Sequence, residues 1–264
     1  MDMRAEAGYA ASATIEGTSG EKTVTEAEWL ACDDPWPMLW SLGGLASERK
    51  LRLLACAFCR RIWQLLPGEA SRLAVEAAEQ FADGAIRRSR LEAAWRAARA
   101  ESDDLAAVVA LGSRSQRAAV GMDAAQAAVD ASARAPRPQD SAAHGARALA
   151  TQAGLRDAGG HRGRGTSAEV PPEFVAQCAL VRDLFGNPSR RVAAPQRAWL
   201  RWNDATVPRM GGAIYDERAF DRLPVLADAL EDAGCADPDW LGHLREPGPH
   251  ARGCWPVDLL LGKA

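Results

Sequence analysis

The segment Glu48–Leu66, ERKLRLLACAFCRRIWQLL, carries the clearest structural signal in this chain of 264 residues. Apolar side chains recur in it every three or four positions, which is the spacing of one face of an amphipathic helix. These positions are Leu51, Leu54, Ala55, Phe58, Ile62 and Leu65. Ser47 precedes the segment as an N-cap residue, and Pro67-Gly68 stops it. The spacing therefore predicts a long helix at this position.

Further helices are predicted on both sides of this segment. Thr25 stands three residues before Glu28, which is the spacing of a capping box. A short helix should begin at Asp34-Pro35, because proline is tolerated in the first turn. Another should cover residues 69–82, where apolar side chains again follow the helical period. We therefore expect at least four helices in the first third of the chain.

The middle of the chain is different in composition. From Ser89 it becomes rich in alanine, which favours helix but buries little apolar area per residue. Between Arg134 and Gly165, proline, glycine and arginine interrupt any period, which is typical of a flexible connection. Residues 189–208 show neither helical nor alternating spacing, and we expect an irregular connection there.

These patterns predict an all-α protein, an irregular multi-helix bundle with a disordered N-terminus and a flexible central connection. No segment alternates apolar and polar residues for long enough to indicate a sheet. We expect four parts: a disordered extension (1–23), an N-terminal helical block with Ala-rich helices (24–133), an Arg/Gly/Pro-containing connection (134–170) and a C-terminal helical block (171–264). The second block should pack on the first.

Composition limits the function. The formal net charge of −3 gives no general reason to expect nucleic acid or an anionic membrane as a partner. No apolar run approaches the roughly 18 residues that span a membrane, and the start of the chain lacks the features of a secretory signal. We therefore expect a cytoplasmic protein. Nine tryptophans are predicted to anchor its packing.

The six cysteines are expected to be reduced thiols or metal ligands, because nothing indicates an oxidising compartment. Cys56-Ala-Phe-Cys59 forms a C-x-x-C pattern inside the predicted helix. Redox-active pairs of this kind begin a helix, and zinc knuckles need a turn between the thiols. Cys56 and Cys59 are therefore interpreted as small apolar side chains of a packed helix.

A candidate metal site lies near the C-terminus. Cys235, His243, His250 and Cys254 follow the spacing C-x7-H-x6-H-x3-C, across a helix end and a Pro/Gly turn. Two thiolates and two imidazoles would complete a tetrahedral zinc site, with a structural role because no position stays open for water. The alternative is that the cysteines are core or surface thiols and the histidines bind local backbone. No cofactor other than zinc is expected.

Two charged stretches invite functional readings that their spacing does not support. Asp216 and Glu217, in the segment YDERAFDR, are adjacent and so point about 100 degrees apart on a helix, which excludes a shared acid/base site. A solvated or interdomain charge network is expected instead. Residues 134–164 hold six arginines against two aspartates but no aromatic residue to stack on bases, so we expect a solvated linker.

Several blocks of the sequence resemble a bacterial protein family with no established activity. The blocks are WLACDDPWPML (29–39), RKLRLLACAFCRRIW (49–63), LVRDLFGNP (180–188), AIYDERAFDRLPVLADALEDAGC (213–235) and PGPHARGCWPVDLLLGK (247–263). The resemblance implies domain limits of roughly 25–84 and 177–263 and a bacterial cytosolic setting. It implies no catalytic residue and no cofactor.

No complete catalytic set can be assembled from the spacing, so we expect a protein that is not an enzyme. The first hypothesis is a cytosolic interaction or adaptor module that binds another protein, because tryptophans and amphipathic helices are abundant. The second is a small protein with a structural or regulatory zinc site in the C-terminal block. A hydrolase using cysteine or histidine ranks below both.

Overall fold

The structure, a computed structural model, describes residues 24–42, 46–111, 115–152, 171–190 and 192–263. Within these ranges it contains twelve α-helices and two short 3-10 turns, and no strand. The all-α prediction is confirmed. The predicted disordered extension, 1–23, lies outside the described residues. Among the described helices, none combines the length and apolar character needed to cross a membrane.

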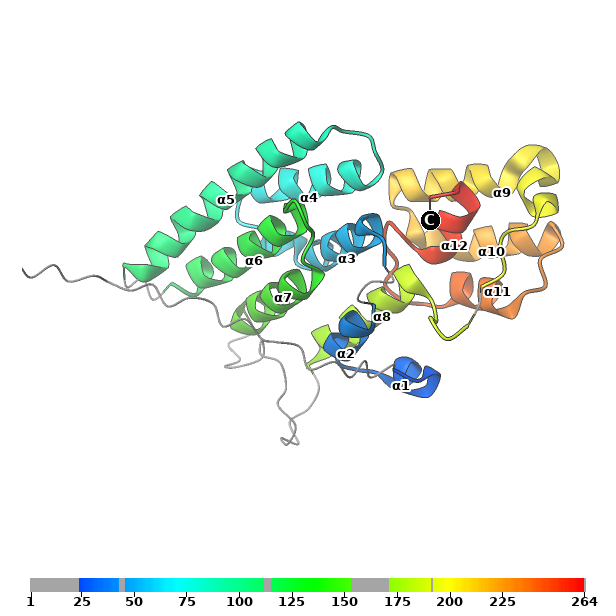
Figure 1. Cartoon of the computed structure of the whole chain (residues 1–264), viewed down its shortest axis with the longest axis horizontal. Helices are drawn as coiled ribbons and strands as arrows, with labels where there is room; N and C mark the ends of the chain where they lie inside the picture. The colour runs from blue at the N-terminus through cyan, green and yellow to red at the C-terminus, as the bar shows by residue number, and fades with distance from the viewer. Residues whose placement is uncertain (1–23, 43–45, 112–114, 153–170, 191, 264) are drawn as a thin grey trace, which may run out of the picture.

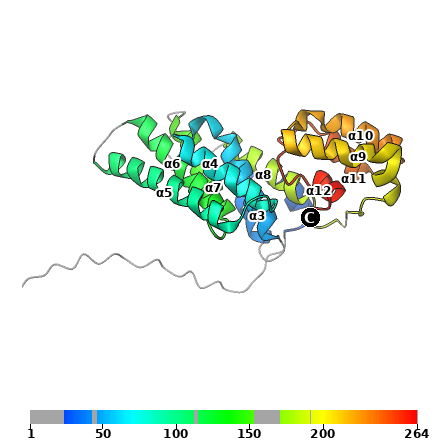
Figure 2. The same cartoon turned by 90° about the horizontal axis from the view of Figure 1, so that it is seen from above.

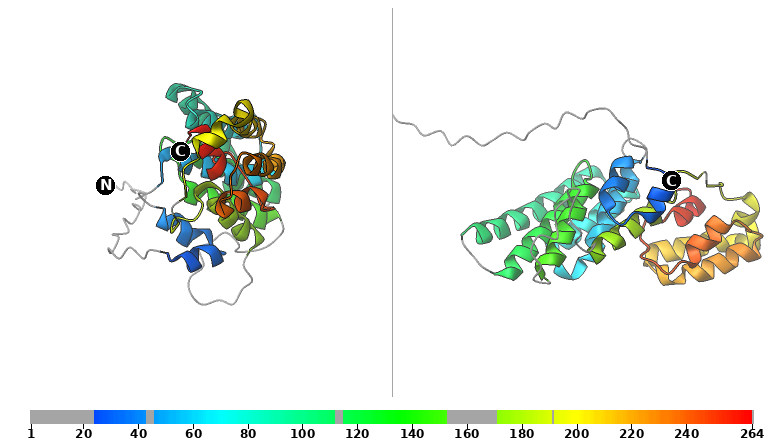
Figure 3. Two further views of the ribbon diagram at one scale, coloured as in Figure 1. Left: turned by 90° about the vertical axis from the view of Figure 1, so that its right-hand side faces the viewer. Right: turned by 90° about the horizontal axis from the view of Figure 1, so that it is seen from below.

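The helices form two groups side by side along the long axis, with α8 between them (Figure 1). The views from above (Figure 2) and from below (Figure 3, right) show the same division. The N-terminal bundle consists of α3 (Glu48–Arg61), α4 (Glu69–Ala82), α5 (Arg88–Ala110), α6 (Gln116–Ser132) and α7 (Pro138–Gln152). Next to it lie α1 (Glu26–Ala31), α2 (Pro35–Ser41) and α8 (Pro172–Phe185). The C-terminal group consists of α9 (Arg197–Glu217), α10 (Leu223–Asp232), α11 (Pro238–Arg245) and α12 (Trp255–Leu261).

Helix α3 contacts α4, α6 and α7 of the bundle as well as α8, and its predicted start is confirmed. The Ser47 side chain accepts a hydrogen bond from the Lys50 amide, as an N-cap residue does. Every residue from Arg52 to Cys59 is buried, so the helix is covered on more sides than its period alone indicates. The predicted capping box of Thr25 and Glu28 is also present, at the start of α1.

Helix α7 corrects the sequence prediction, because residues 138–152 of the expected connection 134–170 are helical. Pro138 lies in the first turn, where its missing N–H costs nothing. The buried residues of this helix are small: Ala142, Ala146 and Ala148 are 3% exposed or less. Small residues thus let α7 pack closely without a period of large apolar side chains. The rest of the predicted connection, 153–170, lies outside the described residues.

A second correction concerns residues 189–208, where an irregular connection was expected. Helix α9 begins at Arg197, inside that stretch, although its backbone leaves the helical conformation from Trp202 to Ala205. Trp199 is 2% exposed and packs edge-on against Trp240, with ring centroids 5.6 Å apart. This contact anchors the first turns of α9. A single tryptophan produces no helical spacing of apolar residues, so the sequence pattern did not predict the helix.

Polar contacts join the two groups of helices. At the start of α3, Arg49 Nη1 lies 2.6 Å and Lys50 Nζ 2.7 Å from Asp258 Oδ2 of α12. The Tyr215 hydroxyl of α9 donates to Asp83, at the end of α4, over 2.8 Å. Buried or half-buried charges therefore contribute to the packing of the C-terminal group on the N-terminal one.

Candidate metal centre

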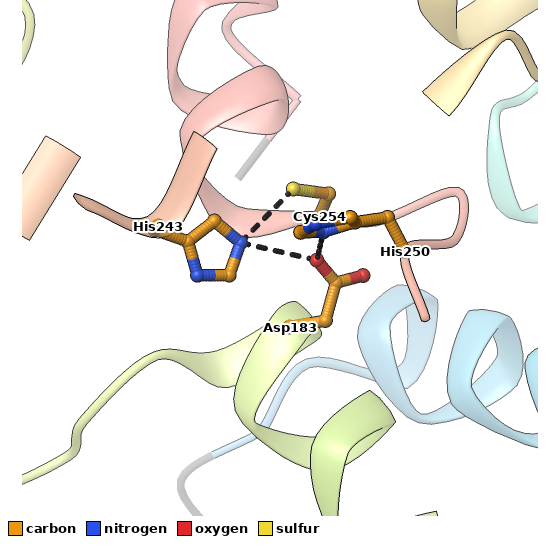
Figure 4. A group of neighbouring side chains, drawn as sticks. All are labelled: Asp183, His243, His250 and Cys254. Atoms are coloured by element: carbon orange, nitrogen blue, oxygen red, sulfur yellow. Dashed lines mark hydrogen bonds and ion pairs between the residues drawn. The ribbon is translucent and has the colours of Figure 1, made fainter. Parts of the chain in front are cut away.

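Four side chains converge where α8, α11 and the N-terminus of α12 meet (Figure 4). They are Asp183, His243, His250 and Cys254, and one donor atom of each lies within 4.8 Å of the donor atoms of the others. Asp183 comes from the last turn of α8, His243 from α11, and His250 from the loop that leads to α12. Cys254 is the N-cap residue of α12.

The loop between α11 and α12 reaches this point because of one glycine. Gly253 has φ +95°, which favours glycine, and a Cβ atom there would lie 3.1 Å from Leu53 and 3.3 Å from Leu184. The Lys50 ammonium then donates to the Gly253 carbonyl at 2.7 Å and to the Leu184 carbonyl at 3.0 Å. Lys50 thus holds Cys254 and the end of α8 at the same place.

The distances describe donors arranged around a common point. His243 Nε2 lies 3.1 Å from Asp183 Oδ1 and 3.4 Å from Cys254 Sγ. His250 Nδ1 lies 2.6 Å from the same Asp183 oxygen. In a Cys-His-Asp catalytic triad the histidine uses one nitrogen for the nucleophile and the other for the carboxylate. Here Nε2 of His243 faces both Asp183 and Cys254, so His243 is not placed as the relay of such a triad.

Backbone groups orient two of the four side chains from outside. The His250 Nε2 atom lies 3.2 Å from the Glu246 carbonyl, and Asp183 Oδ2 accepts a hydrogen bond from the Ala251 amide at 2.9 Å. Metal ligands commonly have such outer partners, which fix the orientation of a ring or a carboxylate. With Nε2 turned to a carbonyl, His250 presents Nδ1 to the centre.

Burial and mutual charge set the protonation of the group. Burial opposes the charge on Asp183, but hydrogen bonds from His243 and His250 outweigh it and lower the pKa of Asp183. Burial also opposes the imidazolium of His250, yet Asp183 raises the pKa of His250. Burial, with the charge of Asp183, raises the pKa of the Cys254 thiol well above its ordinary value. Without a metal, Cys254 is therefore a neutral thiol and a poor nucleophile.

The centre is buried but has one accessible edge. Cys254 is fully buried and Asp183 is 2% exposed. The His243 side chain is 13% exposed and lies in the wall of a pocket of about 300 Å³, next to Glu246 and Trp255. Of the four side chains, His243 is the one that lines this pocket.

The structure brings together three of the four predicted ligands. Among the described residues, Cys235 is not part of the converging group. It lies between α10 and α11, buried in the apolar cluster that also holds Trp240. Asp183 joins His243, His250 and Cys254 instead. Sequence reasoning missed it because it precedes His243 by 60 residues. One sequence feature could have identified Asp183. It stands three positions after buried Leu180, where the helical period predicts an apolar residue.

The other candidate residues agree with their structural interpretations. Cys56 and Cys59 are 1% and 0% exposed in the middle of α3. In the segment YDERAFDR, Glu217 and Arg222 form an ion pair at 3.5 Å, and Arg218 pairs with Glu79 of α4 across the two groups of helices. These residues hold the structure together as a charge network.

Comparison with models of protein families, with curated proteins and with solved structures finds no match to this chain. The resemblance to a bacterial family and the cytoplasmic location therefore stay predictions.

Proposed function

We propose that Asp183, His243, His250 and Cys254 bind one zinc ion, which holds the C-terminal helices in their fold and ties them to α8. The observation that supports this proposal is the convergence of four donor atoms within 4.8 Å of one another. Imidazole, thiolate and carboxylate are the ligand types that zinc takes in proteins. Zinc would replace the protons of His250 and Cys254, because ligands bind metal in their deprotonated form.

The distances suit a tetrahedral ion after a small adjustment. Zinc bonds of about 2.0 to 2.3 Å place neighbouring tetrahedral donors about 3.4 Å apart for nitrogen and oxygen and about 3.6 Å apart for nitrogen and sulfur. His243 already lies 3.1 Å from Asp183 and 3.4 Å from Cys254. The 2.6 Å between His250 and Asp183 is a hydrogen-bond length, so these two must separate by about 0.8 Å to admit zinc.

The donor set favours a structural role. Four protein donors fill a tetrahedral shell and leave no position for a reacting water, whereas catalytic zinc sites keep one open. Asp183 and Cys254 are also too deeply buried for a substrate to reach them. We therefore propose a protein in which the metal supports the fold rather than a zinc enzyme.

The adaptor role has weaker support. Four of the nine tryptophans, Trp29, Trp199, Trp240 and Trp255, are buried, so much of the tryptophan content serves internal packing. Trp40 is the most exposed of the nine, at 58%. Binding of another protein stays a prediction, which recovery of a specific partner by the purified chain would test.

Metal analysis of the purified chain tests the zinc proposal directly. We expect about one zinc per chain, because the four donors make one site. Cys254→Ser should lose the metal, whereas Cys235→Ser, the same change at another buried thiol of the C-terminal group, should keep it. After replacement of zinc by cobalt, a sulfur-to-cobalt charge-transfer band should appear and be absent only from Cys254→Ser. A wild-type zinc content near zero, after growth with zinc, would overturn the proposal.

A further inference from the structure

A second and larger pocket lies in the N-terminal bundle, between α5 and the end of α6. Its volume is about 760 Å³, within the range of small-molecule sites, and it shares no lining residue with the metal centre. Leu91, Trp95 and Val129 supply apolar surface. Five arginines line it as well: Arg88, Arg96, Arg99, Arg134 and Arg137. The pocket thus combines an aromatic wall with a cationic rim.

The sequence of α5 explains this combination. Arg88, Leu91, Trp95 and Arg99 follow one another at three- or four-residue intervals, so they share one face of the helix. Arg88 and Arg99 are exposed, whereas Leu91 is buried and Trp95 half-buried. The alternation along this face places the indole between cations rather than in a continuous apolar core.

Asp130 of α6 is the unusual polar group of the pocket. It is 4% exposed, and its Oδ1 accepts a hydrogen bond from Gln126 Nε2 at 3.1 Å. Among the described residues, Oδ2 has no hydrogen-bond partner, and His144 Nε2 lies 3.7 Å away. Burial raises the pKa of Asp130. Buried acceptors are costly to leave unpaired, so a ligand that brings an N–H donor to Oδ2 gains a contact that the protein leaves open.

The cationic rim is only partly neutralised. Arg99 pairs with exposed Asp103 at 3.0 Å, and Arg137 lies 3.7 Å from exposed Asp140. Neither Arg88 nor Arg134 has an ion pair within the part of the chain that the structure describes. Of the acidic residues that line the pocket besides Asp130, Glu48 is bound by buried Arg52 at 2.8 Å and Glu92 is exposed. Guanidinium groups that are not fully neutralised favour an anion. A phosphate accepts two parallel N–H hydrogen bonds from one guanidinium.

We propose that this pocket binds a nucleoside phosphate whose base carries an amino group. The base stacks on Trp95, since indole is a good platform for any base. Its amino group donates to Asp130 Oδ2, as carboxylates accept from base amino groups elsewhere. The phosphate binds the arginines of the rim. An anion alone would use neither Trp95 nor Asp130, and one aromatic platform matches a single nucleotide rather than a strand.

Isothermal titration of the full chain against a panel of small ligands tests this proposal. AMP, GMP and CMP carry an amino group on the base; UMP, ribose 5-phosphate and inorganic phosphate do not. We expect at least one of AMP, GMP and CMP to bind about tenfold or more tightly than UMP, ribose 5-phosphate or inorganic phosphate. Such a nucleotide contacts Trp95, Asp130 and the arginines together, which the three other ligands do not. Equal binding across the panel, or no binding of any nucleotide, would overturn the proposal.

Variants locate the site. Trp95→Ala should weaken binding of the preferred nucleotide about tenfold through the loss of stacking. Asp130→Asn, nearly identical in shape, should remove most of the preference over UMP. Arg96→Gln should weaken binding several-fold, whereas Arg90→Gln, an exposed arginine of the same helix that does not line the pocket, should leave it unchanged. Because Arg96 and Arg90 are both exposed, these two variants should fold even where Trp95→Ala does not. Equal affinities of Arg96→Gln and Arg90→Gln for the nucleotide would contradict the assignment of this pocket.

Discussion

Gly253 is the residue on which the metal centre most depends without being a ligand. It has φ +95°, and a Cβ atom at this position would meet Leu53 at 3.1 Å and Leu184 at 3.3 Å. Gly253→Ala therefore combines an unfavourable backbone conformation with overpacking, and we expect it to lower the free energy of unfolding by about 2 to 4 kcal/mol. Urea denaturation followed by circular dichroism measures the change.

Gly248 provides the matched control in the same loop. A Cβ atom there would have no other atom within 4 Å. Gly248→Ala should therefore change the free energy of unfolding by no more than about 0.5 kcal/mol, as is usual for surface substitutions. If Gly253→Ala were equally mild, the close approach of this loop to α3 and α8 would be wrong.

The thiols should differ sharply in reactivity, because five of the six are buried and Cys32 is half-buried. Burial raises the pKa of Cys178 to about 12 and raises that of Cys56 well above its ordinary value. Thiols react as thiolates. In metal-free native protein near pH 8, a disulfide reagent should therefore modify at most Cys32 rapidly, and all six cysteines only in denaturant. Cys32→Ser should abolish the rapid phase, and a second rapidly modified thiol would contradict the burial pattern.

The sequence predicted the candidate site only in part, and the reason lies in single residues. His243, His250 and Cys254 occur within twelve positions of one another, so loop wrapping was enough to suggest that they meet. Asp183 belongs to a different helix, and carboxylates are common enough that none stands out without three-dimensional contacts. Cys235 completed the expected spacing, but it lies in the apolar cluster of α9 to α12 away from the converging group.

Among the helices, prediction succeeded where caps and large apolar side chains mark an element. The Thr25 capping box and the Ser47 cap of α3 are both local patterns, and both are present. Helix α7 was missed because its buried face consists of small residues, such as Ala142 and Ala148, rather than large apolar side chains. Contacts of small residues depend on a neighbouring helix and leave no period in the sequence.

The start of α3 and the first turns of α12 are joined through Asp258, and this contact gives a prediction for Asp258→Asn. Asp258 is fully buried, and Arg49 binds both of its oxygens, at 2.6 and 3.0 Å. Removing its charge leaves Arg49 and Lys50 partly buried without their main partner. Because both cations keep other contacts, we expect a loss of about 2 to 4 kcal/mol in the free energy of unfolding, measured by urea denaturation.

Asp228→Asn, in an exposed ion pair between α10 and α11, is the control for this substitution. Asp228 binds Arg245 at 2.7 Å, but its side chain is 69% exposed. Exposed ion pairs contribute little, so this substitution should cost less than about 1 kcal/mol. Equal effects of the two substitutions would show that the junction between α3 and α12 is not what Asp258 stabilises.

In the whole molecule, the two groups of helices have separate apolar clusters. One is formed by α9 to α12, and another by α1, α2, α3 and α8 with part of α7. They are joined by the ion pairs of Asp258, the contacts of Lys50 with two carbonyls, the group around Asp183 and the close approach of Gly253 to Leu53 and Leu184. Asp183 lies on α8, in the cluster beside the N-terminal bundle, whereas His243 and Cys254 belong to the C-terminal group of helices. A metal bound there therefore crosslinks the two.

If zinc binds at this position as proposed, the stability of the entire chain should depend on it. An ion present at 100 times its dissociation constant stabilises the folded state by about 2.7 kcal/mol, if it does not bind the unfolded chain. For a chain of this size that corresponds to a melting temperature lower by roughly 5 to 10 °C when a strong chelator is added. Scanning calorimetry should show the shift in wild type and in Cys235→Ser. Cys254→Ser, which lacks one ligand, should melt at the same temperature with and without chelator. Equal melting temperatures of the wild type in zinc and in chelator would mean that the four side chains hold the junction by hydrogen bonds alone.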